Sequence, residues 1–386
     1  MKLLIYSEYF LPIPGGVQTI VLGLAQGLAA WKPEKSDAEA IEVTVVTRTQ
    51  ERMEEDMQLP FRLVRTRSFR ALTGLMREAD IIHLAGPAML PLILGLGLRK
   101  RVVIEHHGFQ VSCPNGLLFF EPSQTPCPGY FMAGRYEKCI ECNRVEIGLP
   151  KSWYWLMLTH VRRWLANRVA INIVPTAWLG TVLKLKRMRT VHHGISPTVP
   201  AKSGNPLVTN FAYQGRLVTA KGIDVFLEAV ERLRADGFEF KLKIIGDGSQ
   251  ETALKARMPQ ILKEQVEFLG HLPDDKLEEA LAETATVVMP SLGGEVFGLV
   301  AAENMLRGKL LIVSDIGALK EVVGEAGLVF PTGDADQLAA RMRQVLENPS
   351  LARSLGAEAR VRAMQAFDRD SMIERHISVY REALSR

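Results

Sequence analysis

The chain has 386 residues, of which 47% are hydrophobic and 23% are charged, and its formal net charge at pH 7 is +4. This composition excludes a disordered or fibrous chain, and the length predicts two or three domains. Residues 1–200 hold 24 Lys and Arg against 16 Asp and Glu, whereas residues 201–386 hold 23 against 27. The first half is therefore basic and would attract a lipid phosphate, an anionic membrane surface or a nucleic acid.

Short apolar strands alternate with helical patterns in the first hundred residues. Strands are predicted at Lys2–Tyr6, Val43–Thr47, Ile81–Leu84 and Val102–Glu105. Strands that alternate with helices predict right-handed βαβ units on a parallel sheet. The apolar run 81–98 contains a histidine and two prolines, which favours a buried strand and a core helix over a membrane span. Because no secretory signal is evident, we expect a cytoplasmic protein, with association at the cytoplasmic face of a membrane as an alternative.

Residues 108–150 interrupt this pattern. They contain all four cysteines and several Pro and Gly, which predicts a long insertion or lid. An amphipathic helix is predicted at 153–169, with Trp153, Trp155 and Trp164 beside a basic face, followed by a strand at Ile171–Pro175. This helix has two interpretations, a core helix with a solvated basic face or a peripheral membrane contact.

A second βαβ series follows the Pro-, Ser- and Gly-rich stretch Ser196–Pro206, which we interpret as a linker. Its predicted strands are Asn210–Gln214, Leu242–Ile245, Val266–Leu269, Thr286–Met289 and Leu310–Val313, and its predicted helices are 223–235, 251–257, 275–282, 299–307 and 335–346. The predicted fold is two Rossmann-like α/β domains, 1–198 and 199–370. We expect the C-terminal helix, within 371–386, to pack back on the first domain.

Charged residues and glycines follow the strands of the second half, where a parallel sheet binds ligands. The segment from Pro290 to Glu303 follows a strand and opens a helix, with Glu295 before the helix and Glu303 eight residues later, which predicts that both carboxylates lie near one face. Arg216 and Lys221 follow another strand and could neutralise a diphosphate. Each of these pairs also has a structural interpretation, as a helix-dipole partner or a solvated turn.

Together these segments resemble the donor domain of the GT-B glycosyltransferases of family 4, also called group 1. The matching residues are Gly215-Arg216-Leu217 with Lys221-Gly222, Gly246-Asp247-Gly248, Gly270-His271-Leu272, and Pro290-Ser291 through Glu295, Phe297-Gly298-Leu299 and Glu303. The resemblance implies that Arg216 and Lys221 bind the donor diphosphate, that Glu303 holds the ribose and that Glu295 holds the donor sugar. It further implies donor contacts at Gly246, His271, Leu272, Phe297, Gly298 and Leu299.

The first half carries weaker parts of the same resemblance. Pro14-Gly15-Gly16-Val17 is similar to the family's Gly-Gly turn near the donor phosphate. The segment Ile104–Gly108 is similar to the family strand that ends in a cleft histidine, which implies a catalytic role for His107. The alternative for His107 is a satisfied core histidine. His193 stands where the family usually has Asn, and we assign it no chemistry.

The cysteines form a second candidate site. Cys113, Cys127, Cys139 and Cys142 lie within 30 residues, and the last two have a metal-ligand spacing. Four thiolates would hold a structural zinc ion. Free thiols, a disulfide and an iron–sulfur cluster are the alternatives.

From this resemblance we expect a retaining, metal-independent glycosyltransferase that moves a hexosyl group from an NDP-sugar to a glycan or lipid-linked acceptor, in polysaccharide or glycolipid synthesis. No catalytic metal and no nucleic acid are expected. Two alternatives are a GT-B relative that epimerises a nucleotide sugar or phosphorolyses a glycan, and a non-catalytic binding protein.

Overall fold

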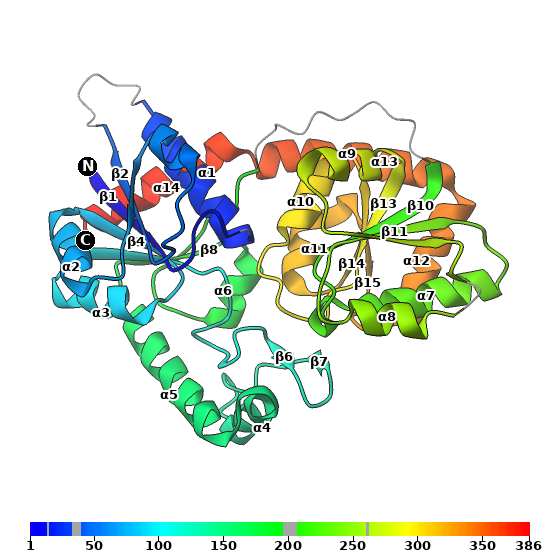
Figure 1. The fold of residues 1–386 in the computed structure, drawn as a ribbon, viewed down its shortest axis with the longest axis horizontal. Coiled ribbons are helices and arrows are strands. Elements are labelled where there is room, and N and C mark those ends of the chain that lie inside the picture. Colours follow the sequence, from blue (N-terminus) through cyan, green and yellow to red (C-terminus); the bar gives the residue numbers. More distant parts are fainter. Residues whose placement is uncertain (14, 33–39, 196–206, 260–261) are drawn as a thin grey trace. The chain divides into compact units, whose positions relative to one another are not determined.

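The computed structural model describes residues 1–13, 15–32, 40–195, 207–259 and 262–386 (Figure 1). The chain forms two compact units. The first comprises Met1–Gly116, Gly129–Ser196 and Phe367–Arg386, and the second comprises Leu117–Pro128 and Pro197–Ala366. The predicted linker Ser196–Pro206, which includes the predicted boundary after residue 198, lies outside the described residues.

The first unit is built on a seven-stranded parallel sheet. Its strand order is β3-β2-β1-β4-β5-β8-β9. The strands are β1 (Lys2–Ser7), β2 (Glu42–Thr47), β3 (Arg62–Arg65), β4 (Ile81–Ala85), β5 (Arg101–Glu105), β8 (Ile171–Val174) and β9 (Met188–Thr190). The helices that connect them include α1 (Gly16–Ala30), α2 (Phe69–Glu78), α3 (Met89–Gly97) and α6 (Ala177–Leu183). The apolar run after residue 80 is thus a buried strand and a short helix.

The second unit is built on a six-stranded parallel sheet with the order β12-β11-β10-β13-β14-β15. The strands are β10 (Leu207–Gln214), β11 (Lys241–Ile245), β12 (Val266–Gly270), β13 (Thr284–Met289), β14 (Leu310–Ser314) and β15 (Leu328–Phe330). The helices are α7 (Ile223–Ala235), α8 (Glu251–Arg257), α9 (Asp274–Ala282), α10 (Leu299–Leu306), α11 (Gly317–Val323), α12 (Ala335–Glu347) and α13 (Pro349–Ala366). Two parallel sheets in one chain confirm the predicted α/β class.

The C-terminal helix α14 (Arg369–Leu384) belongs to the first unit. Its buried face includes Ile373, His376 and Tyr380. A Cβ added at Gly27 of α1 would lie 2.5 Å from the Ile373 side chain, so the two helices pack closely. Because α14 crosses back under β4 and β5, residues from the end of the chain reach the centre of the first sheet.

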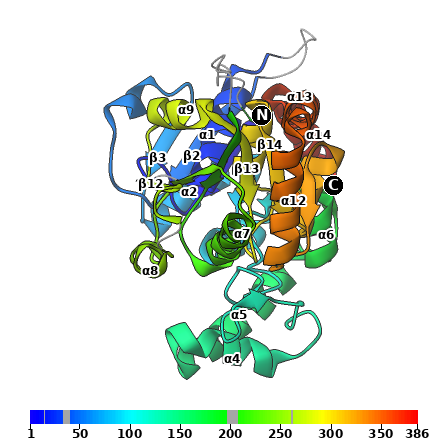
Figure 2. The ribbon, with the colours of Figure 1, turned by 90° about the vertical axis from the view of Figure 1, so that its right-hand side faces the viewer.

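The region 108–150 contains more regular structure than the sequence indicates. It forms a hairpin of β6 (Phe119–Phe120) and β7 (Thr125–Pro126), and the helix α4 (Tyr136–Ile147). The buried positions of α4 are Cys139, Cys142 and Asn143, so the helical period is carried by residues that hydrophobic patterning does not count. Figure 2 shows α4 beside α5 (Leu149–Ala166), with both helices projecting from the rest of the first unit. Among the described residues, no helix is long and apolar enough to cross a membrane.

Candidate functional site

The candidate donor residues of the second unit lie where its strand order reverses. β10 and β13 are neighbours in the sheet, but β11 and β12 continue on one side and β14 and β15 on the other. Connections leave such a switch point in opposite directions and open a crevice at the carboxyl ends of the strands. Arg216 follows β10 and the loop from Pro290 follows β13, so both segments lie at this point.

Glycines bring the loops after three neighbouring strands into backbone contact. The N–H of Gly215 donates to the carbonyl of Ile245 at 2.9 Å, and the N–H of Gly246 donates to the carbonyl of Gly270 at 2.7 Å. Gly246 has φ +127°, and a Cβ there would overlap the carbonyl oxygen of Gly215. The predicted G-R-L, G-D-G and F-L-G segments are therefore joined to one another by backbone hydrogen bonds.

A buried ion pair joins the two sides of the switch point. The Nζ of Lys221, in the 3₁₀ turn Thr219–Lys221, donates to Oε1 of Glu295. The hydroxyl of Ser291 donates to the same oxygen at 3.1 Å. Glu295 is only 9% exposed, so its carboxylate is fixed by two donors in a setting with little water.

The backbone of the loop after β13 is also held by hydrogen bonds. The N–H groups of Leu292 and Gly293 donate to the carbonyl of Ala220 at 2.9 and 3.1 Å. The N–H of Gly294 donates to the carbonyl of Leu117 at 2.7 Å, and Leu117 comes from the hairpin segment assigned to the second unit. The loop is therefore preorganised before any ligand binds.

Arg216 is exposed, unlike Lys221. Its backbone is fixed, because the hydroxyl of buried Tyr213 donates to its carbonyl at 2.8 Å. Burial raises the pKa of Tyr213, and the nearby Glu295 charge adds to this, so the hydroxyl keeps its proton. Among the described residues no carboxylate pairs with the guanidinium, which leaves it available for an anionic ligand.

Glu303 lies in α10, whose N-cap Gly298 has φ +90°. Glu295 lies in the loop before this helix, as predicted, and the expectation that both carboxylates lie near one face stays a prediction. Glu303 is half-buried. Burial raises its pKa above the ordinary value, although Arg307 opposes the shift.

The remaining predicted donor residues differ in exposure. The Phe297 side chain is buried, Leu272 and Leu299 are half-buried, and His271 is exposed after β12. Gly15 and Gly16 are exposed at the start of α1 in the first unit. Their contacts with a donor stay predictions.

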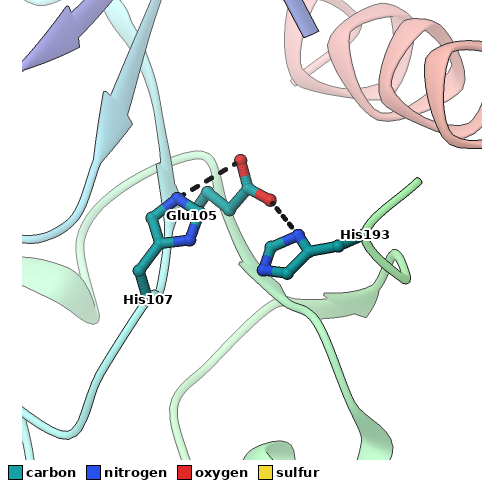
Figure 3. A group of neighbouring side chains, drawn as sticks. All are labelled: Glu105, His107 and His193. Carbon is teal, nitrogen blue, oxygen red and sulfur yellow. Dashed lines mark ion pairs between the residues drawn. The ribbon is translucent and has the colours of Figure 1, made fainter. Parts of the chain in front are cut away.

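His107 lies just after β5 in the first unit and belongs to a cluster that the sequence analysis did not identify. Its Nε2 is 3.7 Å from Oε2 of Glu105, and Nδ1 of His193 is 3.4 Å from Oε1 of the same carboxylate (Figure 3). Two further histidines, His83 and His376, also face Glu105. The only sequence signal was one carboxylate at the end of the apolar strand Val102–Glu105.

Burial and charge act in opposite directions on this cluster. Burial alone would raise the pKa of Glu105, but the surrounding imidazoles outweigh it and hold the pKa well below the ordinary value. Burial lowers the pKa of His107 to about 3 and also lowers that of His83. The cluster therefore holds an ionised carboxylate beside two rings, those of His83 and His107, whose charged form burial disfavours.

Two of the four cysteines, Cys113 and Cys142, contact the same residue, Asn115. Cys113, Cys139 and Cys142 are buried, and Cys127 is partly exposed. The amide of Asn115 accepts from the Cys113 thiol at 2.9 Å and donates to the Cys142 sulfur at 3.4 Å. In the described part of the chain, the one group of three side chains that could hold a metal ion is Glu105, His107 and His193. Zinc at the cysteines stays a prediction.

Comparisons with known proteins agree with the geometry of the second unit. The family model described as "Glycosyl transferases group 1" matches residues 202–362, which include every predicted donor residue of that unit. A glycogen synthase of Mycobacterium tuberculosis is 36% identical over 172 residues, 44% of this chain and 41% of that protein. A phosphatidyl-myo-inositol mannosyltransferase of Mycolicibacterium smegmatis is 28% identical over 195 residues, 48% of this chain and 49% of that protein. These matches span less than half the length of either relative.

Solved structures extend the similarity of fold to both units. A sucrose-phosphate synthase from Thermosynechococcus elongatus aligns over 100% of this chain and 99% of its own, with a TM-score of 0.70 and 20% identity. Anabaena HepE in complex with UDP-glucose aligns over 99% of both chains, with a TM-score of 0.69 and 16% identity. The fold is therefore GT-B, and residues 202–362 match the family described as "Glycosyl transferases group 1".

Proposed function

We propose that the chain is a retaining glycosyltransferase that transfers a hexosyl group from an NDP-sugar to a glycan or lipid-linked acceptor. The observation that carries this proposal is the Lys221–Glu295 pair at the switch point of the second sheet, with the uncommitted guanidinium of Arg216 on the neighbouring strand end. A fixed carboxylate beside two cations suits a ligand that joins sugar hydroxyls to a diphosphate.

Each donor residue then has a role. Arg216 and Lys221 stabilise the charge that develops on the departing diphosphate, which is electrostatic catalysis by groups already in place. Glu295 accepts hydrogen bonds from the donor sugar, and Glu303 accepts from the ribose. The remaining proposed contacts are Gly246, His271 and Leu272 near the base, the backbone of Phe297–Leu299 near the phosphates, and Gly15, Gly16 and His107 from the first unit. In this mechanism the leaving phosphate receives the acceptor proton, and no catalytic metal is required.

The names of similar proteins support the substrate classes. The relatives include a glycogen synthase and a phosphatidyl-myo-inositol mannosyltransferase, whose names give a glycan and a glycolipid acceptor. One similar structure was solved with UDP-glucose. For this chain we infer an NDP-sugar donor and an acceptor of one of these two classes, in polysaccharide or glycolipid synthesis.

The test is a panel of nucleotide sugars, screened first for thermal stabilisation and then for transfer to glycan and lipid-linked acceptors. We expect one donor to stabilise the protein and to be consumed only with an acceptor, giving a product whose anomeric configuration by NMR matches the donor. Consumption without an acceptor and with a changed sugar would indicate an epimerase, and dependence on inorganic phosphate a phosphorylase. Stabilisation without turnover on any acceptor would indicate a binding protein and contradict the proposal.

Donor affinity should weaken on acidification at a higher pH than an ordinary glutamate would give. Because burial raises the pKa of Glu303, this carboxylate takes up a proton earlier as the pH falls, and the protonated group loses an acceptor for the ribose hydroxyls. The donor KM measured against pH should rise below this raised pKa. Glu303→Gln should have a high KM that no longer depends on pH in this range. A wild-type KM that stays flat through the acidic range would remove Glu303 from the ribose site.

We further propose that α5 contacts an anionic membrane. Trp153 and Trp164 are 51% and 56% exposed, and Met157 and Val161 lie exposed between them on one stripe of the helix. Arg168 lies over the Trp164 ring, which places a cation beside the apolar stripe. An exposed apolar stripe flanked by cations is typical of a helix that lies in the membrane interface.

Vesicles of anionic lipid should therefore bind the wild-type protein, and the double variant Trp153→Ser and Trp164→Ser should bind much less. Met364→Ser removes a similarly exposed apolar side chain from α13 and serves as the control, with unchanged binding. If the wild type stays in the supernatant when the vesicles are sedimented, the membrane contact is absent and a soluble glycan becomes the expected acceptor.

A further inference from the structure

Glu105 is a carboxylate in a position where the chain would ordinarily place an apolar residue. It is the last residue of β5, an inner strand of the first sheet, and it is completely buried. Imidazole nitrogens face both of its oxygens, at distances of 3.2–3.7 Å. Burying an ionised carboxylate is very unfavourable without charged or hydrogen-bonding partners, so the groups around Glu105 must stabilise it.

Four histidines surround this carboxylate, and they come from four separate segments of the first unit. Nδ1 of His193 is 3.4 Å from Oε1. The three other rings face Oε2, with Nε2 of His83 at 3.2 Å, of His376 at 3.6 Å and of His107 at 3.7 Å. The fold therefore gathers imidazole nitrogens around Glu105 from β4, from the segments after β5 and β9, and from α14.

Two of the three histidines that face Oε2, His83 and His376, are anchored on their far sides. Nδ1 of His376 is 2.9 Å from the carbonyl of Met372, and because a carbonyl can only accept, this nitrogen carries a proton. Nδ1 of His83 is 2.9 Å from the hydroxyl of Tyr380. These contacts orient the rings that in turn orient the carboxylate.

The other side of the cluster has the spacing of a metal site. One ligand atom from each of Glu105, His107 and His193 lies within 4.8 Å of the other two. Around a tetrahedral zinc ion with bonds of about 2.0–2.1 Å, neighbouring ligand atoms are about 3.3 Å apart. The separation of 3.4 Å between Oε1 of Glu105 and Nδ1 of His193 is close to that value, and Nε2 of His107 is 3.7 Å from the other oxygen of the same carboxylate. His107 is the least buried of the three residues, although its side chain is only 7% exposed.

We propose that Glu105, His107 and His193 form a binding site for a divalent transition-metal ion in the first unit, with zinc as the best-suited ion. Two imidazoles and one carboxylate suit zinc, whereas magnesium and calcium prefer oxygen ligands alone. His83 and His376 act as outer partners that hold the carboxylate, as the partners of metal ligands do in known sites. The ion would add a positive charge beside the buried carboxylate.

This site is distinct from the donor residues of the second unit and from the four cysteines. It shares one residue with the proposed reaction, because Nε2 of His107 cannot bind an ion and orient a sugar at the same time. If the proposed function is correct, bound zinc inhibits transfer. Metal binding itself does not depend on that function and is measured without substrate.

The test is metal binding by the full chain after treatment with a chelator and dialysis against zinc. We expect about one equivalent of zinc per chain by elemental analysis, and a higher thermal midpoint with zinc than without it. With cobalt as the probe, nitrogen and oxygen ligands should give visible ligand-field bands without the near-ultraviolet charge-transfer band of a thiolate. Glu105→Gln and His193→Gln should each lose the bound equivalent.

Two controls separate this site from its neighbours. His106→Gln changes the adjacent buried histidine, whose ring pairs with Asn172 and not with Glu105, and should keep the metal. Cys139→Ser with Cys142→Ser should also keep it. The proposal is overturned if the wild type binds no zinc, if both Glu105→Gln and His193→Gln keep it, or if the cysteine variant loses it and the cobalt form shows thiolate charge transfer. Circular dichroism establishes that each variant is folded.

Discussion

Replacing Lys221 with alanine is expected to lower kcat/KM for transfer by about 10²–10³-fold, the usual loss when one fixed group that stabilises developing charge is removed. The variant loses a cation that faces the departing diphosphate. It also removes one of the two hydrogen-bond donors described for the buried Glu295 carboxylate. Only the other, the Ser291 hydroxyl, is left. Both effects disfavour the transition state, since the carboxylate would then repel the diphosphate.

The measurement is the initial rate of nucleoside diphosphate release with acceptor present. Lys241→Ala is the matched control, because this exposed lysine begins β11 at the opposite, amino-terminal edge of the same sheet. It removes the same charge from the same unit and should leave the rate unchanged. Glu295→Gln should also be strongly impaired, and its combination with Lys221→Ala should cost less than the product of the single losses, because the two side chains act as one unit. A Lys221→Ala rate close to wild type would contradict the assignment of the donor site.

The second large effect concerns stability. Gly222→Ala is expected to destabilise the second unit by about 2–6 kcal/mol, because left-handed strain and overpacking each contribute about 1–3 kcal/mol. Gly222 has φ +67°, and a Cβ there would overlap the carbonyl oxygen of Pro290. The side chain would therefore push Lys221 away from the loop that carries Glu295.

Gly237→Ala provides the control that separates strain from overlap. Gly237 has φ +85°, and a Cβ there would meet nothing within 4 Å, so its alanine variant should lose only the strain of about 1–3 kcal/mol. All five tryptophans lie in residues 31–178, so their fluorescence follows the first unit, whereas far-ultraviolet circular dichroism follows both. Equal losses for the two variants would show that the contact with Pro290 does not limit the packing of this loop.

The second sheet could be predicted nearly strand by strand. Its strands are apolar, and several end in a glycine or a charged residue. The pattern therefore indicates both the strand and the residue at which it ends. The helices 223–235 and 251–257 were predicted with their observed bounds. Short edge strands were not predicted: β3 has the sequence Arg-Leu-Val-Arg and β15 has three residues, too few for a period to be visible.

The two candidate sites differed in how well sequence could reveal them. The predicted donor residues of the second unit lie in four glycine-marked segments, so local patterns mark each of them. The cluster around Glu105 depends on residues nearly 300 positions apart, since Tyr380 orients His83. No local pattern reports such a contact, and a buried histidine in an apolar strand has no distinctive neighbours in sequence.

The hairpin segment Leu117–Pro128 has a consequence for how donor domains can be exchanged among relatives. It is encoded in the N-terminal half, yet its Leu117 carbonyl holds Gly294 in the loop beside Glu295. A chimaera joined at residues 196–206 would combine one parent's glycine-rich loop with the other parent's hairpin. Such hybrids should keep the structure of this loop only when residues 117–128 come from the same parent as the loop. The second unit therefore cannot be exchanged as one continuous segment of the sequence.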